Sequence, residues 1–439
     1  MSTIAAISTP GGRGGIGIVR LSGESAVKIG AQLFRCSKNF ADIPDRYMTL
    51  GKIDADGIFE QALCVVFRSP NSYTGEDVVE FHCHGGVALT QKVLRAAIAA
   101  GAVPASRGEF TKRAFLNGKL KLSDAEGIAD MINAEGEASL NAAFRLMSGE
   151  LSKRVTAMQF ELLDLIAYLE AAIDYPYELE DEAVPSGKNK IEEILSELVK
   201  LLATKERGKM IKDGISVAII GLPNAGKSSL LNCLLKEERA IVTDIEGTTR
   251  DVVEDMLVYR GEVIRLLDTA GIRDTDNVIE RIGIERSEKA VRGADAVILL
   301  LDGAVADDRE SKLFELVGGK KCLVCVNKGD IPLKRKLSGI ETVISAKTGE
   351  GVEGLLDKLL SITCGMDTDG ELLTNERHVD AVRRAVKALN SALENYDSFY
   401  MDCILTDLRE AYDALGEITG NTARADIIEA IFDKFCVGK

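Results

Sequence analysis

The spacing of apolar positions in the first half of the chain predicts two kinds of structure. From residue 2 to about 118, short β-branched runs alternate with glycine-rich turns, which is typical of strands, and one helical stretch covers 88–100. At 123–175 and again at 190–207, apolar residues recur every three or four positions, as in long amphipathic helices. The pattern therefore predicts an α/β domain followed by a helical one.

This helical pattern is interrupted and then resumes. Between about 210 and 365, short apolar runs return and alternate with helical segments, as in an α/β domain. Helical periodicity follows at 376–392, 403–419 and 424–434. The simplest interpretation is a helical domain into which an α/β domain is inserted. The predicted boundaries are 1–118 for the N-terminal domain, 119–209 and 366–439 for the two parts of the helical domain, and 210–365 for the insertion.

Length and charge narrow the class of protein. A chain of 439 residues is too long for one compact core, and its net charge of −15 argues against indiscriminate nucleic-acid binding, although a local basic patch is compatible with it. Nine scattered cysteines indicate reduced thiols. We find neither a bilayer-length apolar run nor a signal-like N-terminus, so we expect a cytoplasmic protein without a membrane-spanning segment.

A phosphate-binding loop follows the apolar run 215–220. Residues 221–229 read Gly-Leu-Pro-Asn-Ala-Gly-Lys-Ser-Ser and precede the helix-like stretch 230–235. In such a strand, loop and helix, backbone N–H groups surround the phosphates, Lys227 reaches the β- and γ-phosphates, and the Ser228 hydroxyl ligates Mg²⁺. The predicted nucleotide contacts here come from Asn224, Ala225, Gly226, Lys227, Ser228 and Ser229.

Three further segments, each placed after an apolar run, indicate that the base is guanine. They are Asp268-Thr269-Ala270-Gly271, Asn327-Lys328-Gly329-Asp330 and Ser345-Ala346-Lys347. The Asp330 carboxylate can accept hydrogen bonds from the guanine N1–H and 2-amino groups, which adenine does not present, while the Lys328 stem covers the ring. Four coincidental loops in this order are the weaker interpretation.

Two features near the N-terminus invite other interpretations. Residues 12–17 contain Gly-x-Gly-x-x-Gly, but the chain continues as a strand where a dinucleotide fingerprint opens a helix, so we favour a glycine-rich hairpin. His82 and His84 flank Cys83 and suggest a metal site. Neighbouring strand residues point to opposite faces, so only the two histidines converge, and we find no distant residues that could complete a metal site. We therefore interpret the three as ordinary strand residues before a turn.

With these motifs the whole chain resembles the tRNA-modifying GTPase family MnmE, also called TrmE. The resemblance covers the segments 12–23, 69–77 and 108–119, the inserted GTPase domain, and the terminal Phe-Cys-Val-Gly-Lys at 435–439. It implies a multidomain fold: an N-terminal α/β folate-binding and dimerisation domain, an all-α domain, and a Ras-like P-loop GTPase domain with a mostly parallel sheet. It also implies a homodimer that joins the flavin-dependent MnmG (GidA) in a heterotetramer.

The activity implied by the resemblance is modification of tRNA. Family members add an aminomethyl-type group, such as carboxymethylaminomethyl, at carbon 5 of the wobble uridine, position 34, using a one-carbon unit on 5-formyl- or methylene-tetrahydrofolate. By motif, Arg20, Glu80 and Lys119 match folate-contacting positions, and Lys439 completes that site. We expect the tail to dock there, so that the Cys436 thiol can act on the one-carbon unit or the uridine. Without the resemblance, Glu80 would be interpreted as a charge on a strand face and Arg20 as a salt-bridge partner. For Cys436, plain packing is the weaker alternative.

Switch I is expected at 243–251, and its predicted nucleotide contacts come from Thr243, Asp244, Ile245, Glu246, Gly247, Thr248 and Thr249. In this segment Thr249 places its hydroxyl on Mg²⁺, and Asp268 supports the ion through water. Ile272 stands where Ras-like enzymes keep a water-orienting glutamine. The resemblance assigns that task to Glu280, whose alternative role is a carboxylate at a helix N-terminus.

The sequence lacks an arginine finger, so another positive charge must act between the phosphates. The resemblance implies K⁺, held by Asn224, the carbonyls of Thr243 and Ile245, and Thr248. Ordering of this loop around the ion is expected to accompany dimerisation of two GTPase domains.

Two other functions compete with tRNA modification. A regulatory GTPase would use the flanking domains only to bind a partner, and Cys436 would be dispensable. A ribosome-assembly GTPase would carry a basic RNA-binding module, and we find none after residue 365.

Overall fold

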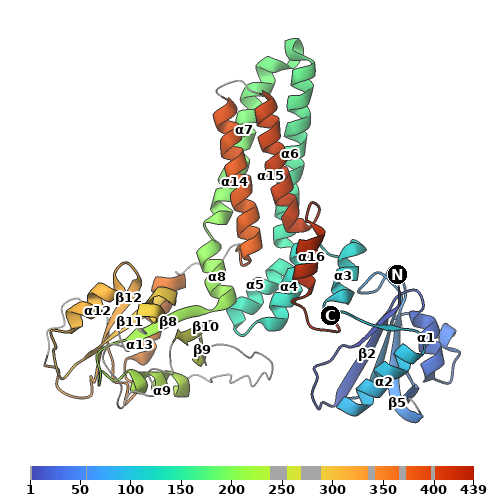
Figure 1. Ribbon diagram of the computed structural model, residues 1–439, viewed down its shortest axis with the longest axis horizontal. Coiled ribbons are helices and arrows are strands. Elements are labelled where there is room, and N and C mark those ends of the chain that lie inside the picture. Colours follow the sequence, from blue (N-terminus) through green and yellow to red (C-terminus); the bar gives the residue numbers. More distant parts are fainter. Residues whose placement is uncertain are drawn as a thin grey trace. The chain divides into compact units, whose positions relative to one another are not determined.

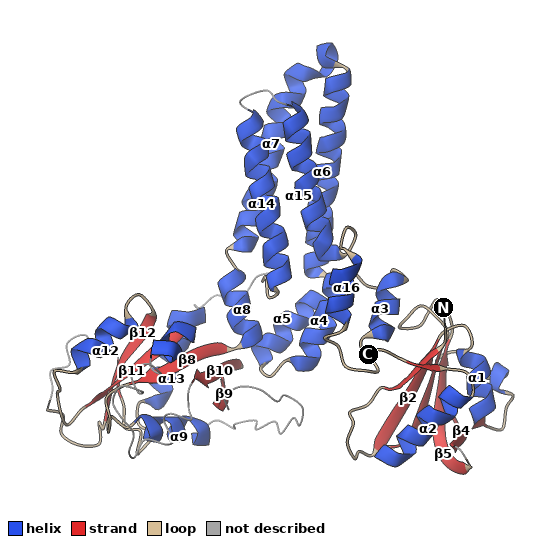
Figure 2. Cartoon of the chain, in the orientation of Figure 1, coloured by secondary structure: helices blue, strands red, loops and turns tan. Residues whose placement is uncertain are grey.

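The computed structural model describes residues 2–55, 57–237, 255–267, 288–334, 342–364, 372–396 and 401–439. These residues form two compact units (Figure 1). One comprises residues 1–129, 145–188 and 388–439, and the other comprises residues 130–144 and 189–387. The strands belong to two sheets, one in each unit, and the intervening chain is helical (Figure 2).

The first unit contains a seven-stranded sheet with the order β3-β4-β5-β6-β2-β1-β7. Its strands are β1 (Ile4–Ile7), β2 (Ile16–Ser22), β3 (Phe34–Arg35), β4 (Thr49–Ala55), β5 (Ile58–Phe67), β6 (Val78–His84) and β7 (Val103–Pro104). Neighbouring strands are antiparallel, except that β7 runs parallel to β1. The strand β2 starts at Ile16, so the glycine-rich segment before it leads into a strand as predicted.

Helices cover one face of this sheet. Along β6, Val79 and Phe81 are buried in a core with residues of α1 (Ala26–Leu33) and α2 (Val87–Ala99). Because side chains alternate along a strand, Glu80 and His82 belong to the opposite face. That face is covered only in part, where Phe110 of α3 (Glu109–Leu116) packs with Ile4 and Ala6 of β1, and it carries the polar side chains of β2 and β6.

Long helices make up the rest of the first unit. The helix α15 (Met401–Thr419) packs along α6 (Glu150–Asp174), where the buried amide of Gln159 donates to the carbonyl of Tyr412 over 3.1 Å. The other helices of this unit are α3 (Glu109–Leu116), α4 (Leu122–Asn133) and α16 (Ala425–Phe432), and α4 ends in the second unit. The helices α5 (Glu137–Met147), α7 (Pro176–Leu202) and α14 (Glu376–Tyr396) also have residues in both units.

The second unit contains a six-stranded sheet with the order β13-β12-β11-β8-β10-β9. Its strands are β8 (Ile215–Ile220), β9 (Asp255–Tyr259), β10 (Glu262–Leu267), β11 (Ala296–Asp302), β12 (Lys321–Asn327) and β13 (Thr342–Val343). All neighbouring pairs are parallel except β9 with β10. This sheet confirms the predicted mostly parallel P-loop domain.

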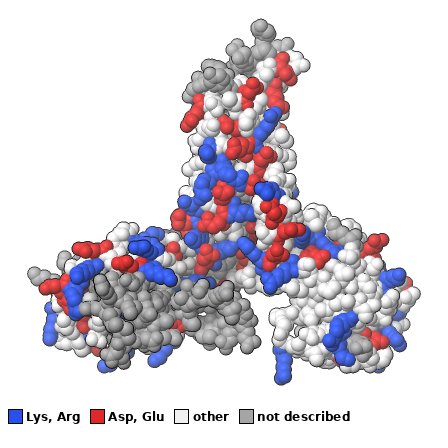
Figure 3. Space-filling model, in the orientation of Figure 1, with Lys and Arg blue, Asp and Glu red and all other residues white. Residues whose placement is uncertain are grey.

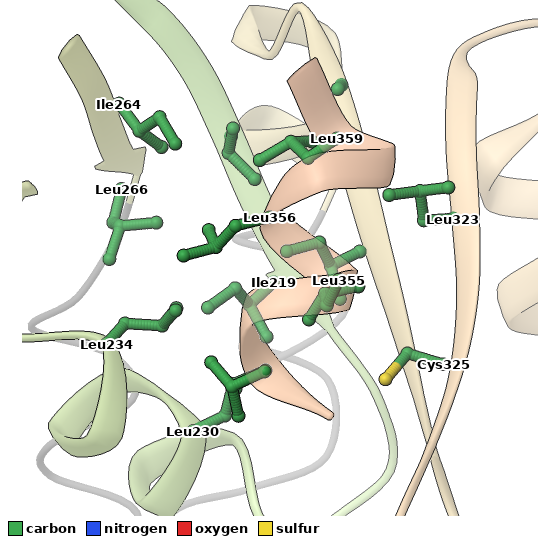
Figure 4. Packing of buried hydrophobic residues seen from close by; sticks show 14 of the residues in the cluster. Ile219, Leu230, Leu234, Ile264, Leu266, Leu323, Cys325, Leu355, Leu356 and Leu359 are labelled. Atoms are coloured by element: carbon green, nitrogen blue, oxygen red, sulfur yellow. The ribbon is translucent and has the colours of Figure 1, made fainter. Parts of the chain in front are cut away.

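Both faces of this second sheet are buried, as in other parallel sheets. On one face, Ile219 packs with residues of α9 (Lys227–Glu237) and α13 (Val352–Cys364), including Leu355 and Leu359 (Figure 4). On the other face, Ile220 packs in a second core with α12 (Glu310–Val317). The central strand β8 has β10 on one side and β11 on the other, so its carboxyl end lies at a topological switch point, where α/β sheets bind ligands.

Candidate functional site

The loop between β8 and α9 has a backbone that its glycines permit. Gly226 has φ +96°, and a Cβ atom there would lie 2.1 Å from the Asn327 side-chain nitrogen. A Cβ at Gly221 would lie 2.4 Å from the carbonyl oxygen of Leu300. Asn224 also adopts a left-handed conformation, with φ +66°. Larger side chains at the two glycines would therefore disrupt the phosphate-binding loop.

The Lys227 side chain folds back onto the loop and hydrogen-bonds to its first two residues. Its ammonium donates to the carbonyls of Gly221 over 2.9 Å and Leu222 over 3.0 Å. Burial lowers the pKa of Lys227, because the charged form has lost part of its hydration. A polyphosphate would offer this ammonium a stronger, charged partner.

Asn327 joins the phosphate-binding loop to the predicted base-binding loop. This side chain is 3% exposed, and its amide nitrogen donates to the carbonyl of Ala225 over 2.9 Å. Its amide oxygen accepts from the backbone N–H of Ala346 over 2.9 Å. One buried amide therefore fixes the relative position of two loops that the sequence places more than a hundred residues apart.

Ser345 holds Asp330 at the same edge of the sheet. The Ser345 hydroxyl donates to the Asp330 carboxylate over 2.8 Å and accepts from the backbone N–H of Thr348 over 3.2 Å. The Gly329 N–H donates to the carbonyl of Ile344 over 2.9 Å. These bonds orient the carboxylate that the sequence assigns to guanine.

A cavity of about 600 Å³ lies beside these loops. Its volume is typical of a small-molecule site. Its lining residues are Gly226, Ser229, Asn232, Cys233, Lys236, Asn327, Lys328, Asp330, Ile331, Ala346, Lys347, Thr348 and Gly349. The structure thus brings three of the four predicted motifs around one cavity.

The remaining predicted residues of the GTPase site lie outside the described residues. They are Thr243, Asp244, Ile245, Glu246, Gly247, Thr248, Thr249, Asp268, Thr269, Ala270, Gly271 and Glu280. Of the predicted Mg²⁺ and K⁺ ligands, the described part of the chain contains Ser228 in the first turn of α9 and Asn224 in the loop before it.

The face of the first sheet that lies away from α1 and α2 carries a cluster of partly buried charged side chains. Sheet register places Arg20 of β2 directly opposite Glu80 of β6, and the guanidinium donates to the carboxylate over 2.7 Å. His82, two residues along β6, bonds the other carboxylate oxygen over 3.2 Å. Burial raises the pKa of Glu80, but the hydrogen bonds and charges of His82 and Arg20 outweigh burial and hold that pKa below its ordinary value.

Loop 69–77 and α3 place two aromatic rings beside this cluster. The Arg20 guanidinium lies 5.8 Å from the ring centre of Tyr73 and 5.6 Å from that of Phe110, distances typical of cation–π contacts. The Lys119 ammonium donates to the carbonyl of Pro70 in the same loop over 3.0 Å. Arg20 and Lys119 therefore contact the same loop, and Glu80 is linked to it through Arg20.

The C-terminal tail docks beside them. Phe435 is buried against Phe432, and the carbonyl of Cys436 accepts from the backbone N–H of Gly108 over 3.4 Å. The carbonyl of Lys439 accepts from the backbone N–H of Phe110 over 3.2 Å, and the Phe110 ring also contacts Arg20. The Cys436 side chain is exposed. The tail is therefore held by the Phe435 ring and by backbone hydrogen bonds, while the Cys436 side chain stays exposed.

Sequence reasoning missed three charged residues near these sites. Arg113 is 4% exposed and pairs with Glu76, which in turn accepts a hydrogen bond from Ser22, so it ties loop 69–77 to α3. Asp302, at the end of β11, pairs with Lys328. The position of Asp302 directly after an apolar run, as in the three motifs, is the signal that could have identified it.

Surface charge and hydropathy add little to this picture. On the visible face of the helical segments, acidic and basic side chains are interspersed (Figure 3). No helix in the described part of the chain combines the length and the apolar character that crossing a bilayer requires.

Known proteins resemble this chain over its whole length. Residues 3–119 match the family model described as GTP-binding protein TrmE N-terminus, and residues 122–436 match the MnmE helical domain. A relative from Carboxydothermus hydrogenoformans, named tRNA modification GTPase MnmE, is 43% identical over 458 residues, covering 100% of this chain and 99% of the relative. Relatives of the same name from Finegoldia magna and Geobacillus kaustophilus are 41% and 40% identical, and each match covers at least 99% of both chains.

Proposed function

The chain belongs to the MnmE family of tRNA modification GTPases, and from this premise we propose that it hydrolyses GTP to support modification of carbon 5 of the wobble uridine in tRNA. The observation that supports GTP binding and hydrolysis is the pair of hydrogen bonds made by the Asn327 side chain. They hold the phosphate-binding loop and the base-binding loop around one cavity. The tRNA part rests on the relatives' name and on full-length identity to them.

The nucleotide site would bind GTP with Mg²⁺. Lys227 and the loop N–H groups would hold the β- and γ-phosphates, and Ser228 with Thr249 would ligate Mg²⁺. Asp330 would accept from the guanine N1–H and 2-amino groups, and Ser345, Ala346 and Lys347 would line the base.

K⁺ would replace the missing arginine finger. Asn224 supports this proposal by its place in the phosphate-binding loop, three residues before Lys227, and by its exposed side chain, which has an oxygen that an ion can bind. Thr243, Ile245 and Thr248 would complete the oxygen ligands. Glu280 would orient the attacking water, since Ile272 has no group that can do so.

The sheet face that carries Arg20 and Glu80 would hold a tetrahydrofolate. The chemistry of the donor set fits this group. A pterin presents N–H groups that can donate hydrogen bonds to the ionised Glu80 carboxylate. The glutamate part of a folate presents carboxylates that Lys119 and Lys439 can bind. Tyr73 offers an aromatic face beside Arg20. The folate supplies the one-carbon unit, and the exposed Cys436 thiol would act on that unit or on the uridine.

A second copy of this chain is the proposed partner of the N-terminal sheet. Apolar side chains are exposed along β4, β5 and the turn before them: Tyr47, Met48, Leu50, Ile58 and Phe59 are 44–59% exposed. Exposed apolar patches of this kind mark protein–protein interfaces. The flavin-dependent MnmG and tRNA are the further proposed partners, in the cytoplasm, and they rest on the family assignment alone.

The proposed domain boundaries follow the change of pattern in the sequence. The N-terminal domain covers residues 1–118, the helical domain covers 119–209 and 366–439, and the GTPase domain covers 210–365. The strands from β8 to β13 all lie within the last of these ranges.

Nucleoside analysis of bulk tRNA from cells that lack this chain tests the proposed function. We expect the C5-modified wobble uridine to disappear and to return when the wild-type chain is supplied. Normal modification in the deletion strain would favour the alternatives, a regulatory or a ribosome-assembly GTPase. An altered profile of ribosomal particles in the same strain would then identify the second of these.

A further inference from the structure

Asp302 lies where β11 ends, directly opposite Asn327 in the register of β11 with β12. One of its carboxylate oxygens accepts from the Lys328 ammonium over 2.6 Å. The other accepts from the backbone N–H of Ala304 over 2.8 Å. The carboxylate is therefore fixed to its own turn on one side and to the lysine of the base-binding loop on the other.

The backbones of the two loops are joined as well. The N–H of Gly303 donates to the carbonyl of Asn327 over 3.0 Å, and the N–H of Lys334 donates to the carbonyl of Gly303 over 2.9 Å. A Cβ atom at Gly303 would lie 2.6 Å from the Asn327 carbonyl oxygen. The pair is thus built on two neighbouring strand ends whose separation is set by the sheet.

Lys328 has a side chain that requires positioning. It lines the cavity, and its backbone has φ +67°, a conformation that is uncommon for residues other than glycine. A lysine stem has many rotamers, and ordering it on ligand binding opposes association. A carboxylate that already holds the ammonium removes most of that cost before the ligand arrives.

We propose that Asp302 is a positioning residue for nucleotide recognition, which holds the Lys328 stem in place to cover the face of the bound guanine. The proposal rests on the proposed guanine site. It predicts that Asp302 acts through Lys328 on the face of the ring, and not on the edge of the base that Asp330 reads.

Asp302→Asn tests this role, because asparagine keeps the size and the bond to the Ala304 N–H but loses the charge that holds Lys328. We expect the affinity for GDP, measured by equilibrium titration of the full chain, to fall about three- to tenfold. Inosine diphosphate lacks the 2-amino group but has the same ring face. Its affinity should therefore fall by the same factor, so that the ratio of the two dissociation constants stays constant.

A double-mutant cycle with Lys328→Met separates positioning from a general structural effect. The Met stem still covers the ring, but it has no ammonium for Asp302 to hold. Asp302→Asn should then have no further effect in that background. Asp308→Asn, which changes an exposed aspartate on the same segment, is the matched control and should leave both affinities unchanged. Asp302→Glu, which keeps the charge, should recover part of the loss.

Three results would overturn the proposal: unchanged GDP affinity in Asp302→Asn, an equal loss in the Lys328→Met background, or a change in the ratio of GDP to inosine diphosphate affinity. If Asp302→Asn fails to fold, the GDP affinities of Asp302→Glu and Lys328→Met are compared with that of the wild type. Wild-type affinity in both variants would also overturn the proposal, whereas weaker GDP binding by both would support it. Failure of the wild-type chain to bind GDP would instead contradict the proposed function.

Discussion

The sheet around β8 has an extended apolar core on each face, whereas the N-terminal sheet has an extended core on one face and only a small one, around Phe110, on the other. In the first case functional side chains can stand only on loops at the carboxyl ends of the strands, and Lys227, Asn327 and Asp330 are all found there. In the second case they stand on the strands themselves, as Arg20 and Glu80 do.

This difference separates two kinds of chemistry. The crevice of the parallel sheet suits a polyphosphate held by backbone N–H groups, while the N-terminal sheet presents a guanidinium–carboxylate ion pair with an aromatic neighbour. We therefore expect variants at the first site to affect GTP hydrolysis and variants at the second to affect tRNA modification alone.

Cys436→Ser should produce the largest effect, complete loss of wobble-uridine modification. Serine keeps the size of the side chain but loses the nucleophilicity of the thiolate. GTP hydrolysis should be retained, because the tail docks at the start of α3 and the nucleotide loops belong to the other unit. Nucleoside analysis of tRNA measures the effect, and Cys403→Ser, at another exposed cysteine, is the control. Full modification by Cys436→Ser would show that the thiol carries no chemistry.

Glu280→Ala should lower the rate of GTP hydrolysis by a factor on the order of 10²–10⁴, the range for loss of a positioned acid–base group. Nucleotide binding should change little, since the carboxylate would act on the attacking water. Single-turnover hydrolysis measures this rate, with Glu288→Ala as the control on the same segment. A wild-type rate would return Glu280 to the role of a helix N-terminal carboxylate.

Replacing K⁺ by Na⁺ should slow hydrolysis, since a fixed ring of oxygens selects the size of the ion it dehydrates. Asn224→Ala should abolish the response to K⁺ and leave GTP affinity nearly intact, because backbone groups bind the phosphates. Steady-state rates in the two salts provide the measurement. Equal turnover in K⁺ and Na⁺ would exclude a cation finger.

The smallest of these effects is expected for Glu80→Gln, which should change how the free energy of unfolding depends on pH. The pKa of Glu80 is lower in the folded chain than its ordinary value of 4.5, so its ion pair stabilises the fold above that pH. This contribution, about 1 kcal/mol, is lost as the pH falls through the folded-state pKa. Urea unfolding of wild type and Glu80→Gln at pH 7 and at acid pH should therefore converge at the lower pH. A constant difference would mean that the pair is not coupled to protonation.

The same contrast explains what could be predicted from the sequence. The nucleotide motifs are contiguous and each follows an apolar strand, so residues such as Lys227 and Asp330 could be assigned directly. The pairing of Arg20 with Glu80 depends on strand register, which no local pattern specifies, and only the family resemblance selected them. The position of Asp302 beside Lys328 depends on β11 being the neighbour of β12 in the second sheet, so its role was missed.

Helix boundaries were also only partly predicted. The stretch 88–100 corresponds to α2, but the periodicity at 190–207 does not show where helices break, and the structure has α7 ending at Leu202 and α8 (Lys205–Asp213) beginning three residues later. The amphipathic pattern continues across that break because both helices bury apolar side chains, including Leu201 and Met210.

The most direct test of two separable sites is a titration of 5-formyl-tetrahydrofolate into the full chain and its Arg20→Gln, Arg35→Gln and Lys227→Ala variants. We predict that Arg20→Gln loses most of the folate affinity. Arg35→Gln, on the same sheet and also beside an aromatic ring, should bind folate as the wild type does, and so should Lys227→Ala. Equal folate affinity of Arg20→Gln and wild type would contradict the account.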